Sequence, residues 1–239
     1  MEPDVPPGPL KDARPSAVAP RGSRWREYLE VILVAVVFAL FVRTFLLQAF
    51  VVPTPSMEPT VLVGDHLVIN KFVFAPHVSW PVSRLLPYRE IRRGDIFVFK
   101  FPEDPQRDFI KRVIAVGGDV LAIRDKEVYV NGARHDEPAV VHEEARTWPD
   151  DPQLPDGLRR RDQLAPTALA PETYFAMGDN RDSSYDSRFW GPVPASSVKG
   201  RALFVYWSFP TSEAGGGIGG WLRRSILGTR WSRTMRPVR

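Results

Sequence analysis

Two short stretches of this sequence carry side chains that together could cleave an amide or ester bond. Ser56 lies among three prolines in segment 53–60, and Lys111 lies in the apolar segment 109–114. A serine hydroxyl is a weak nucleophile until a neighbouring base removes its proton, and a neutral lysine amine can be that base. The prolines stiffen the serine loop, which lowers the entropic cost of presenting the hydroxyl. The two stretches therefore suggest a Ser/Lys pair in a hydrolase that has no catalytic histidine.

Lys111 needs an apolar setting to act as a base. A reference pKa of about 10.4 leaves nearly every lysine protonated at pH 7, and burial can lower it by about 3 units, at a cost of about 4 kcal/mol in folding free energy. Alternate side chains of a strand share a face, so Lys111 would stand with Phe109 and Val113, while Arg112 points the other way. Taken alone, the stretch favours a solvated lysine at a strand edge, which leaves no base.

A third stretch, residues 178–191, is dense in short polar side chains and carries three carboxylates. Such sequences usually form surface loops that hydrogen-bond to themselves. This one directly follows the apolar strand pattern of residues 174–177. Arg112 would need a carboxylate partner if it is buried, and the loop is a candidate source of one.

Composition excludes several other chemistries. The 239 residues are 44% hydrophobic and 25% charged, which is typical of a globular protein with one large domain or two small ones. The absence of cysteine excludes a thiol nucleophile, a cysteine-ligated zinc site and disulfides. His135 and His142 lie near two acidic residues, but this polar, proline-bounded stretch favours a solvated loop over a metal site.

Positive charge gathers at the two ends of the chain. The net charge is +4 and the pI is about 9.5, with five basic residues before residue 27 and six arginines after Trp221. This distribution fits contact with anionic lipid at least as well as contact with nucleic acid. Because no RNA- or DNA-reading motif is present, we expect no nucleic-acid partner.

The N-terminal region changes abruptly in character. Residues 1–27 are rich in proline, alanine and charge, which predicts a disordered cytoplasmic tail. Residues 28–47 have the length and apolar character of a transmembrane helix, with Arg43 able to extend to the interface. A cleaved signal peptide is the alternative, but residues 47–49 make a poor cleavage site and the apolar run continues beyond them. The arginines before the helix predict that the N-terminus stays inside, with the rest of the chain outside.

The remainder predicts a mostly β protein, with a mixed, largely antiparallel sheet. Strand patterns occur at 61–74, 95–101, 109–116, 120–123, 128–130, 174–177 and 201–209. We expect a catalytic β-domain in two parts, 48–124 and 173–210, interrupted by a small insert at 125–172. Residues 211–239 predict a glycine-rich linker and a basic tail, either solvated or lying on a membrane surface.

Taken together, these stretches resemble bacterial type I signal peptidase (leader peptidase), a family of membrane-anchored serine proteases with a Ser/Lys dyad. Several motifs occur in the family's order, which makes the resemblance far more specific than any one of them. The matching segments are 53–60, 64–71, 93–95, 109–119, 178–191 and 230–233.

The resemblance implies a role for individual residues. It makes Ser56 the nucleophile and Lys111 the general base. It assigns Thr54 to the oxyanion hole and Ser184 to a hydrogen bond that orients the lysine amine. It also implies two structural ion pairs, Arg112 with Asp179 and Arg188 with Asp186. Finally, it implies a set of residues lining the shallow pockets for small substrate side chains at positions −1 and −3: Phe50, Val52, Met57, Leu67, Phe109 and Ile110.

Two residues depart from the family pattern. Pro55 precedes the nucleophile, and Ser183 replaces a frequent asparagine. Neither change removes a catalytic atom. Because the insert between residues 131 and 171 is short, the family's accessory β-domain is expected to be reduced.

The implied function is the removal of N-terminal signal peptides from exported preproteins, at small-x-small sites, on the outer face of the cytoplasmic membrane. The expected partners are the signal peptides and the lipid bilayer, and no metal or organic cofactor is required. Two alternatives remain. A Ser/Lys hydrolase of the self-cleaving repressor type would not need the anchor or residues 178–191, and a solvated Lys111 would leave a non-catalytic, membrane-tethered β-domain.

Overall fold

The computed structural model describes residues 24–43, 47–71, 90–210 and 227–238. It divides into two compact units near residue 40. The first contains helix α1, and the second contains all of the strands. Most of the expected tail (1–23) and of the glycine-rich linker (211–226) lies outside the described residues.

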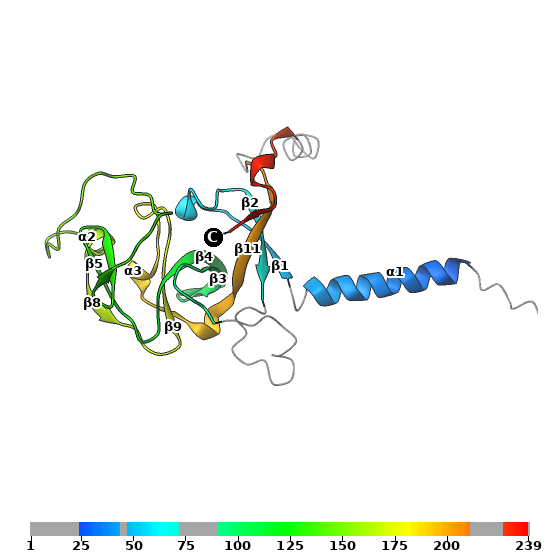
Figure 1. Cartoon of the computed structure of the whole chain (residues 1–239), viewed down its shortest axis with the longest axis horizontal. Helices are drawn as coiled ribbons and strands as arrows, with labels where there is room; N and C mark the ends of the chain where they lie inside the picture. The colour runs from blue at the N-terminus through cyan, green and yellow to red at the C-terminus, as the bar shows by residue number, and fades with distance from the viewer. Residues whose placement is uncertain (1–23, 44–46, 72–89, 211–226, 239) are drawn as a thin grey trace, which may run out of the picture. The chain divides into compact units, whose positions relative to one another are not determined.

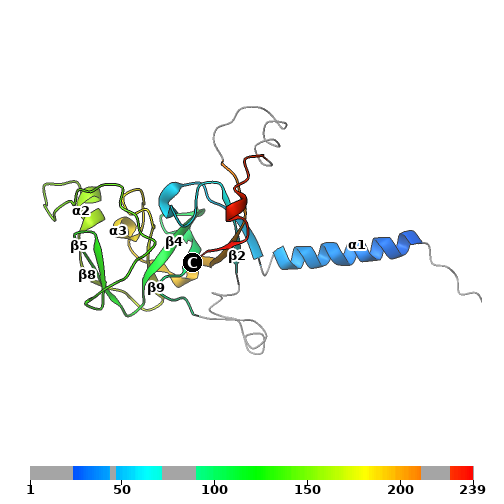
Figure 2. The same cartoon turned by 45° about the horizontal axis from the view of Figure 1, so that its top comes forward.

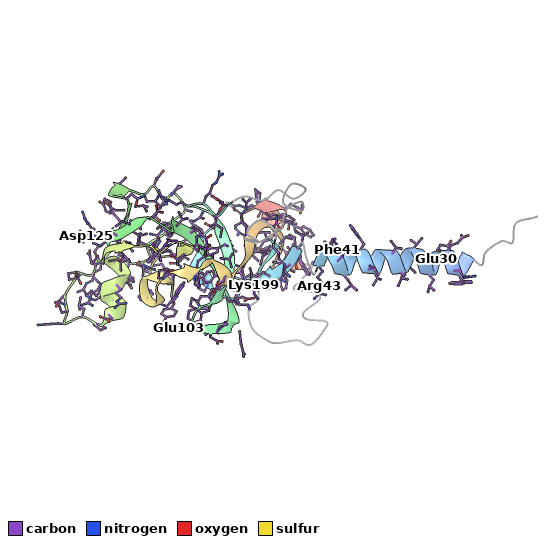
Figure 3. All side chains as sticks on the ribbon, turned by 90° about the horizontal axis from the view of Figure 1, so that it is seen from below. Glu30, Phe41, Arg43, Glu103, Asp125 and Lys199 are labelled. Carbon is purple, nitrogen blue, oxygen red and sulfur yellow. The ribbon has the colours of Figure 1, made fainter. Side chains whose placement is uncertain are left out.

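Helix α1 (Arg24–Phe41) differs from the helix that the sequence predicted. It begins four residues before the predicted segment 28–47, in charged sequence, and it ends at Phe41. Its apolar side chains are exposed and project on all sides of the helix (Figure 3). Among the described residues, no helix combines the length and the apolar character needed to cross a bilayer. The predicted helix bounds of 28–47 are therefore corrected: the apolar run is not one element, because from Leu47 onward it forms a strand.

The second unit is built on two antiparallel sheets (Figure 1), so the prediction of a mostly β, largely antiparallel fold is confirmed. The larger sheet has the order β1-β2-β11-β3-β4-β9-β10, with β12 beside β11. Its strands are β1 (Leu47–Val51), β2 (Asp65–Asn70), β3 (Ile96–Phe101), β4 (Asp104–Val116), β9 (Thr173–Met177), β10 (Val193–Pro194), β11 (Val198–Ser208) and β12 (Arg236–Pro237).

The smaller sheet has the order β7-β6-β5-β8. It contains β5 (Val120–Arg124), β6 (Glu127–Val130), β7 (Ala133–Arg134) and β8 (Leu164–Ala168). Figures 1 and 2 both place β5, β8 and α2 at the end of this unit opposite to β2. The short helical segments are η2 (Pro55–Met57), α2 (Asp156–Asp162), α3 (Ser187–Trp190), η4 (Ala195–Ser197) and η5 (Trp231–Arg233), where η marks a 3-10 turn.

Most strand predictions are confirmed, but the one at 61–74 is too long. β2 begins only at Asp65, because residues 62–65 form a turn closed by the Asp65 N–H, which donates to the Leu62 carbonyl over 3.0 Å. Gly64 adopts a φ of 85°, which favours glycine. Residues 72–74 lie outside the described part of the chain.

One hydrophobic cluster supports both halves of the predicted Ser/Lys pair. It contains Met57 and Val61, near the end of the serine loop, and Ile110, which precedes the lysine. All three side chains are buried. Each buried side chain of this size contributes about 1.5–3 kcal/mol. The loop and the strand are therefore held against the same core.

Candidate active site

The structure brings Ser56 and Lys111 into direct contact. The lysine Nζ lies 2.6 Å from the serine Oγ, within hydrogen-bonding distance. Both residues are only 4% exposed. Lys111 lies in the interior of β4, opposite Phe97 of β3, and its Nζ is 5.6 Å from the centre of the Phe109 ring. The solvated strand-edge lysine that the isolated stretch favoured is therefore not what the fold contains.

Burial lowers the pKa of the Lys111 amine to about 8. The Asp186 and Asp179 carboxylates oppose that shift, and the Arg188 guanidinium adds to it. Burial disfavours the charged ammonium because water no longer solvates it. A sizeable fraction of the amine is thus neutral near pH 7 to 8 and can accept a proton.

The serine sits in a 3-10 turn rather than in an extension of β1. The strand ends at Val51, and η2 starts at Pro55, whose fixed φ suits the first position of such a turn. In a continuous strand Phe50, Val52, Thr54 and Ser56 would share one face, but this turn ends that alternation after Val52. Thr54 is exposed, while Ser56 is buried. Proline at positions 53 and 55 makes a continued strand unfavourable.

Both expected ion pairs are present in the loop 178–191. Asp179 accepts two hydrogen bonds of 2.7 Å from Arg112. Asp186 accepts two from Arg188, of 2.8 and 2.9 Å, and one of 3.0 Å from the Gly178 N–H. Burial would raise the pKa of the Asp186 carboxyl, but the Arg188 charge and hydrogen bonds outweigh it and hold that pKa below its usual value. The loop is therefore a buried scaffold and not a surface turn.

Ser184 lies beside the pair without the hydrogen bond that the resemblance implied. Its hydroxyl is buried, and it makes no hydrogen bond of good geometry to Lys111 or to any other described residue. It is near enough to the Asp186 carboxylate to help lower the pKa of that group. Ser184 is thus placed at the site, but no hydrogen bond joins its hydroxyl to the lysine amine.

Two contacts that the sequence did not reveal tie the serine loop to the rest of the site. The Asn180 N–H donates to the Ser56 carbonyl over 3.2 Å, and the Thr60 hydroxyl donates to Asp179 over 2.6 Å. From the C-terminal segment, Arg233 donates to the Thr60 carbonyl (2.9 Å) and pairs with buried Asp65 (2.6 Å). The family-like ending at 230–233 was the sole sequence signal for these supports.

A cleft of about 430 Å³ opens onto Ser56 and Lys111. Of the predicted pocket residues, Phe50, Phe109 and Ile110 line it, as does Thr54. The other three, Val52, Met57 and Leu67, are fully buried in the core behind the cleft. The wall also includes residues that sequence reasoning missed, namely Phe101, Arg107, Asp108 and Tyr185.

The loop's remaining charges bind residues that lie between β5 and β8 in the sequence, within the part of the chain that forms the smaller sheet. Arg181 forms a two-point ion pair with Glu137. The pKa of the Asp182 carboxyl lies below its usual value. Burial alone would raise it, but the hydrogen bond from the Glu144 N–H and the charges of Lys126 and Arg161 outweigh that effect. In the described part of the chain, no three His, Asp or Glu side chains converge as metal ligands would.

Comparison with known proteins shows the family of the chain. The family described as signal peptidase, peptidase S26, matches residues 25–207. Signal peptidase I of Pseudomonas aeruginosa is 32% identical, over 77% of this chain and 73% of that protein. The Aquifex aeolicus signal peptidase I is also 32% identical, over 77% and 84%. The Bacillus caldolyticus enzyme is 33% identical, over 79% and 92%. A crystal structure of a signal peptidase I from Enterococcus faecalis aligns with 27% identity and a TM-score of 0.36, over 47% of this chain and 97% of that one.

The buried contact between a serine hydroxyl and a lysine amine is chemically suited to hydrolysis, and the sequence matches show the family. The chain belongs to the signal peptidase family, peptidase S26, and is a protease. The resemblance inferred from the sequence motifs is thereby confirmed.

Proposed function

We propose that this protein is a serine endopeptidase that removes N-terminal signal peptides from exported preproteins at small-x-small sites. The observation that carries the proposal is the 2.6 Å contact between Ser56 and a buried Lys111 whose pKa is lowered to about 8. Relatives named signal peptidase I provide the substrate class. The burial of Lys111 also argues against a non-catalytic β-domain.

In the proposed mechanism, Ser56 Oγ attacks the scissile carbonyl while neutral Lys111 takes the hydroxyl proton. The negative charge develops on the carbonyl oxygen, where the Ser56 N–H and the exposed Thr54 hydroxyl are its proposed donors. Lys111 then gives its proton to the leaving amine, and the C–N bond breaks to leave an acyl-enzyme. A water molecule, deprotonated by Lys111, hydrolyses that ester and restores the serine.

The substrate is proposed to bind as an extended strand between β1 and β4. β1 pairs with β2 alone among the described strands, and the first half of β4 pairs only with β3, because β9 begins its pairing at Arg112. Both free edges border the cleft, through Phe50 and residues 108–111. An extended peptide could hydrogen-bond to these edges while small side chains enter the cleft between Phe50, Phe109 and Ile110.

The test of this function is cleavage of a purified preprotein with an Ala-x-Ala site. The full chain should release the signal peptide immediately after the second alanine, as mass spectrometry of both products would show. A preprotein with both alanines replaced by leucine should be cut at least about 100-fold more slowly, because the cleft is shallow. Ser56→Ala should abolish cleavage. No cleavage of the Ala-x-Ala preprotein, or equal cleavage of both substrates, would refute the proposal.

The proposed place of action is the outer face of the cytoplasmic membrane, in contact with the lipid bilayer. In support, α1 exposes large apolar side chains from Val31 to Phe41, and the C-terminal segment exposes Leu227, Trp231 and Met235. Exposed apolar surface of this extent usually marks a membrane or protein contact. An N-terminus on the inner side remains a prediction from the arginines of the tail.

Membrane contact through α1 can be measured by co-sedimentation with vesicles of mixed zwitterionic and anionic lipids. The full chain should partition to the vesicles, and the double variant Leu33→Asp/Val37→Asp should lose at least about tenfold in partition coefficient, since each aspartate makes burial in lipid costly. Val120→Asp, at an exposed valine of β5, is the matched control and should bind like the wild type. Equal partition of the double variant and the wild type would exclude α1 as the membrane contact.

A further inference from the structure

One carboxylate links the strand of the base to the loop of the nucleophile. Asp179 is fully buried, and its two oxygens accept three short, charge-assisted hydrogen bonds. Its Oδ1 accepts from Arg112 Nε over 2.7 Å, and its Oδ2 accepts from Arg112 Nη2 over 2.7 Å and from the Thr60 hydroxyl over 2.6 Å. Arg112 is the neighbour of the base in β4, whereas Thr60 closes the loop that begins at Pro53.

Besides the Ser56–Lys111 contact itself, the Thr60 hydroxyl links the serine loop to β4 through the side chains of Asp179 and Arg112. Its other tie, the 2.9 Å hydrogen bond from Arg233 to the Thr60 carbonyl, runs to the C-terminal segment and not to β4. The loop's backbone bond from the Asn180 N–H to the Ser56 carbonyl is longer, at 3.2 Å, and it joins the loop to the backbone beside Asp179 rather than to the Arg112 side chain. Hydrophobic burial of Met57 and Val61 is non-directional, so it does not fix the serine to a fraction of an ångström.

From this arrangement we infer that Thr60 is a positioning residue: its hydroxyl, through Asp179 and Arg112, sets the distance between Ser56 and Lys111. The inference rests on the proposed function and adds a residue to its machinery. Asp179 keeps both bonds from Arg112 when the threonine hydroxyl is removed, so the carboxylate stays paired and the fold survives. What is lost is the fixed position of the loop relative to β4. Proton transfer from Ser56 to Lys111 depends on that position, because the two side-chain atoms must stay within hydrogen-bonding distance, here 2.6 Å.

The experiment compares Thr60→Val, which removes the hydroxyl at nearly constant volume, with Thr60→Ser, which keeps it. Each full-length variant is assayed with the Ala-x-Ala preprotein at saturating and at limiting preprotein concentrations, so that kcat and KM are measured separately. Thr60→Val should lower kcat by at least about tenfold with KM unchanged within twofold, because the cleft walls do not include Thr60. Thr60→Ser should restore kcat to within about threefold of the wild type. Thr173→Val is the matched control, since the Thr173 hydroxyl donates to a backbone carbonyl in an exposed turn.

Three results would overturn the inference: an unchanged kcat in Thr60→Val, a loss confined to KM, or a Thr60→Ser variant as impaired as Thr60→Val. Thermal unfolding of each variant separates positioning from unfolding, because a variant folded at the assay temperature with reduced kcat cannot owe the loss to unfolded enzyme. Failure of the wild type to cleave would instead count against the proposed function. The two failures are therefore distinguishable.

Discussion

Lys111→Met should abolish peptide cleavage and make the protein more stable. Methionine keeps most of the side-chain volume but has no amine, so Ser56 loses its proton acceptor. A positioned general base contributes about 10²–10⁴ in rate, and residues that act as a unit often cost more than that when one is removed. We expect kcat to fall at least about 10³-fold, with binding of an uncleaved substrate analogue unchanged.

The stability gain follows from the sign of the lysine pKa shift. The pKa is about 8 in the folded protein and 10.5 in the unfolded chain, so between these values the unfolded state binds more protons and the wild type becomes more stable as pH rises. Below about pH 8 the full penalty, about 3 kcal/mol for a shift of that size, opposes folding. Lys111→Met removes this penalty, but the variant also loses the hydrogen bond to Ser56, which costs about 1 kcal/mol of stability. Denaturant unfolding at pH 6 should thus show a net gain of about 2 kcal/mol, shrinking toward pH 10.

Activity of the wild type should rise with pH through about 8, because only the neutral amine accepts the serine proton. Lys100→Met is the matched control, since Lys100 is exposed on the neighbouring strand β3 and outside the cleft. It should change neither kcat nor the pH profile. A flat rate between pH 6 and 9, or measurable turnover by Lys111→Met, would contradict the role of Lys111 as base.

Gly178→Ala should damage both the fold and the site. A Cβ at position 178 would come closer than 3.0 Å to the Ser184 hydroxyl and to the backbone carbonyl oxygen of Ser56. The carbonyl belongs to the loop backbone, so relief of the clash requires the nucleophile itself to move. We expect a loss of about 2–4 kcal/mol in unfolding free energy and at least about 100-fold in kcat.

The control for this variant is Gly157→Ala. Gly157 lies in the first turn of α2, and a Cβ there would meet no atom within 4 Å. Because alanine has the higher helix propensity, stability should stay the same or rise by up to about 1 kcal/mol. If Gly178→Ala matched Gly157→Ala in stability and rate, the close packing of the two loops would not matter for catalysis.

The strands and the Ser/Lys pair were predictable because their signals are local or belong to specific motifs. The β-branched and aromatic runs at 95–101 and 109–116 indicated strands, and the order of the motifs indicated the family. The end of the N-terminal helix was not predictable, because one apolar run contains both α1 and β1 and its periodicity does not distinguish them. Strand alternation does not continue to Ser56, because a 3-10 turn beginning at Pro55 follows β1.

Long-range side-chain contacts account for most of the remaining misses. Thr60 and Asp179 are 119 residues apart, and nothing in either stretch names its partner. Val52, Met57 and Leu67 were expected in the cleft, but apolar residues near a site serve equally well as core, and these three are buried behind it. Tyr185 enters the cleft from the polar loop, where an exposed aromatic carries no periodic signal.

The pairing of Asp65 with Arg233 spans 168 residues, and β12 completes the large sheet beside β11. The turn before β2 is thus supported by a segment that is synthesised long after it. Contacts of such high sequence separation slow folding, because the intervening chain must be ordered before they form. A chain that stops before Arg233 therefore carries Ser56 and Lys111 without the arginine that donates to the Thr60 carbonyl. We expect such a chain to cleave poorly until Arg233 has paired with Asp65.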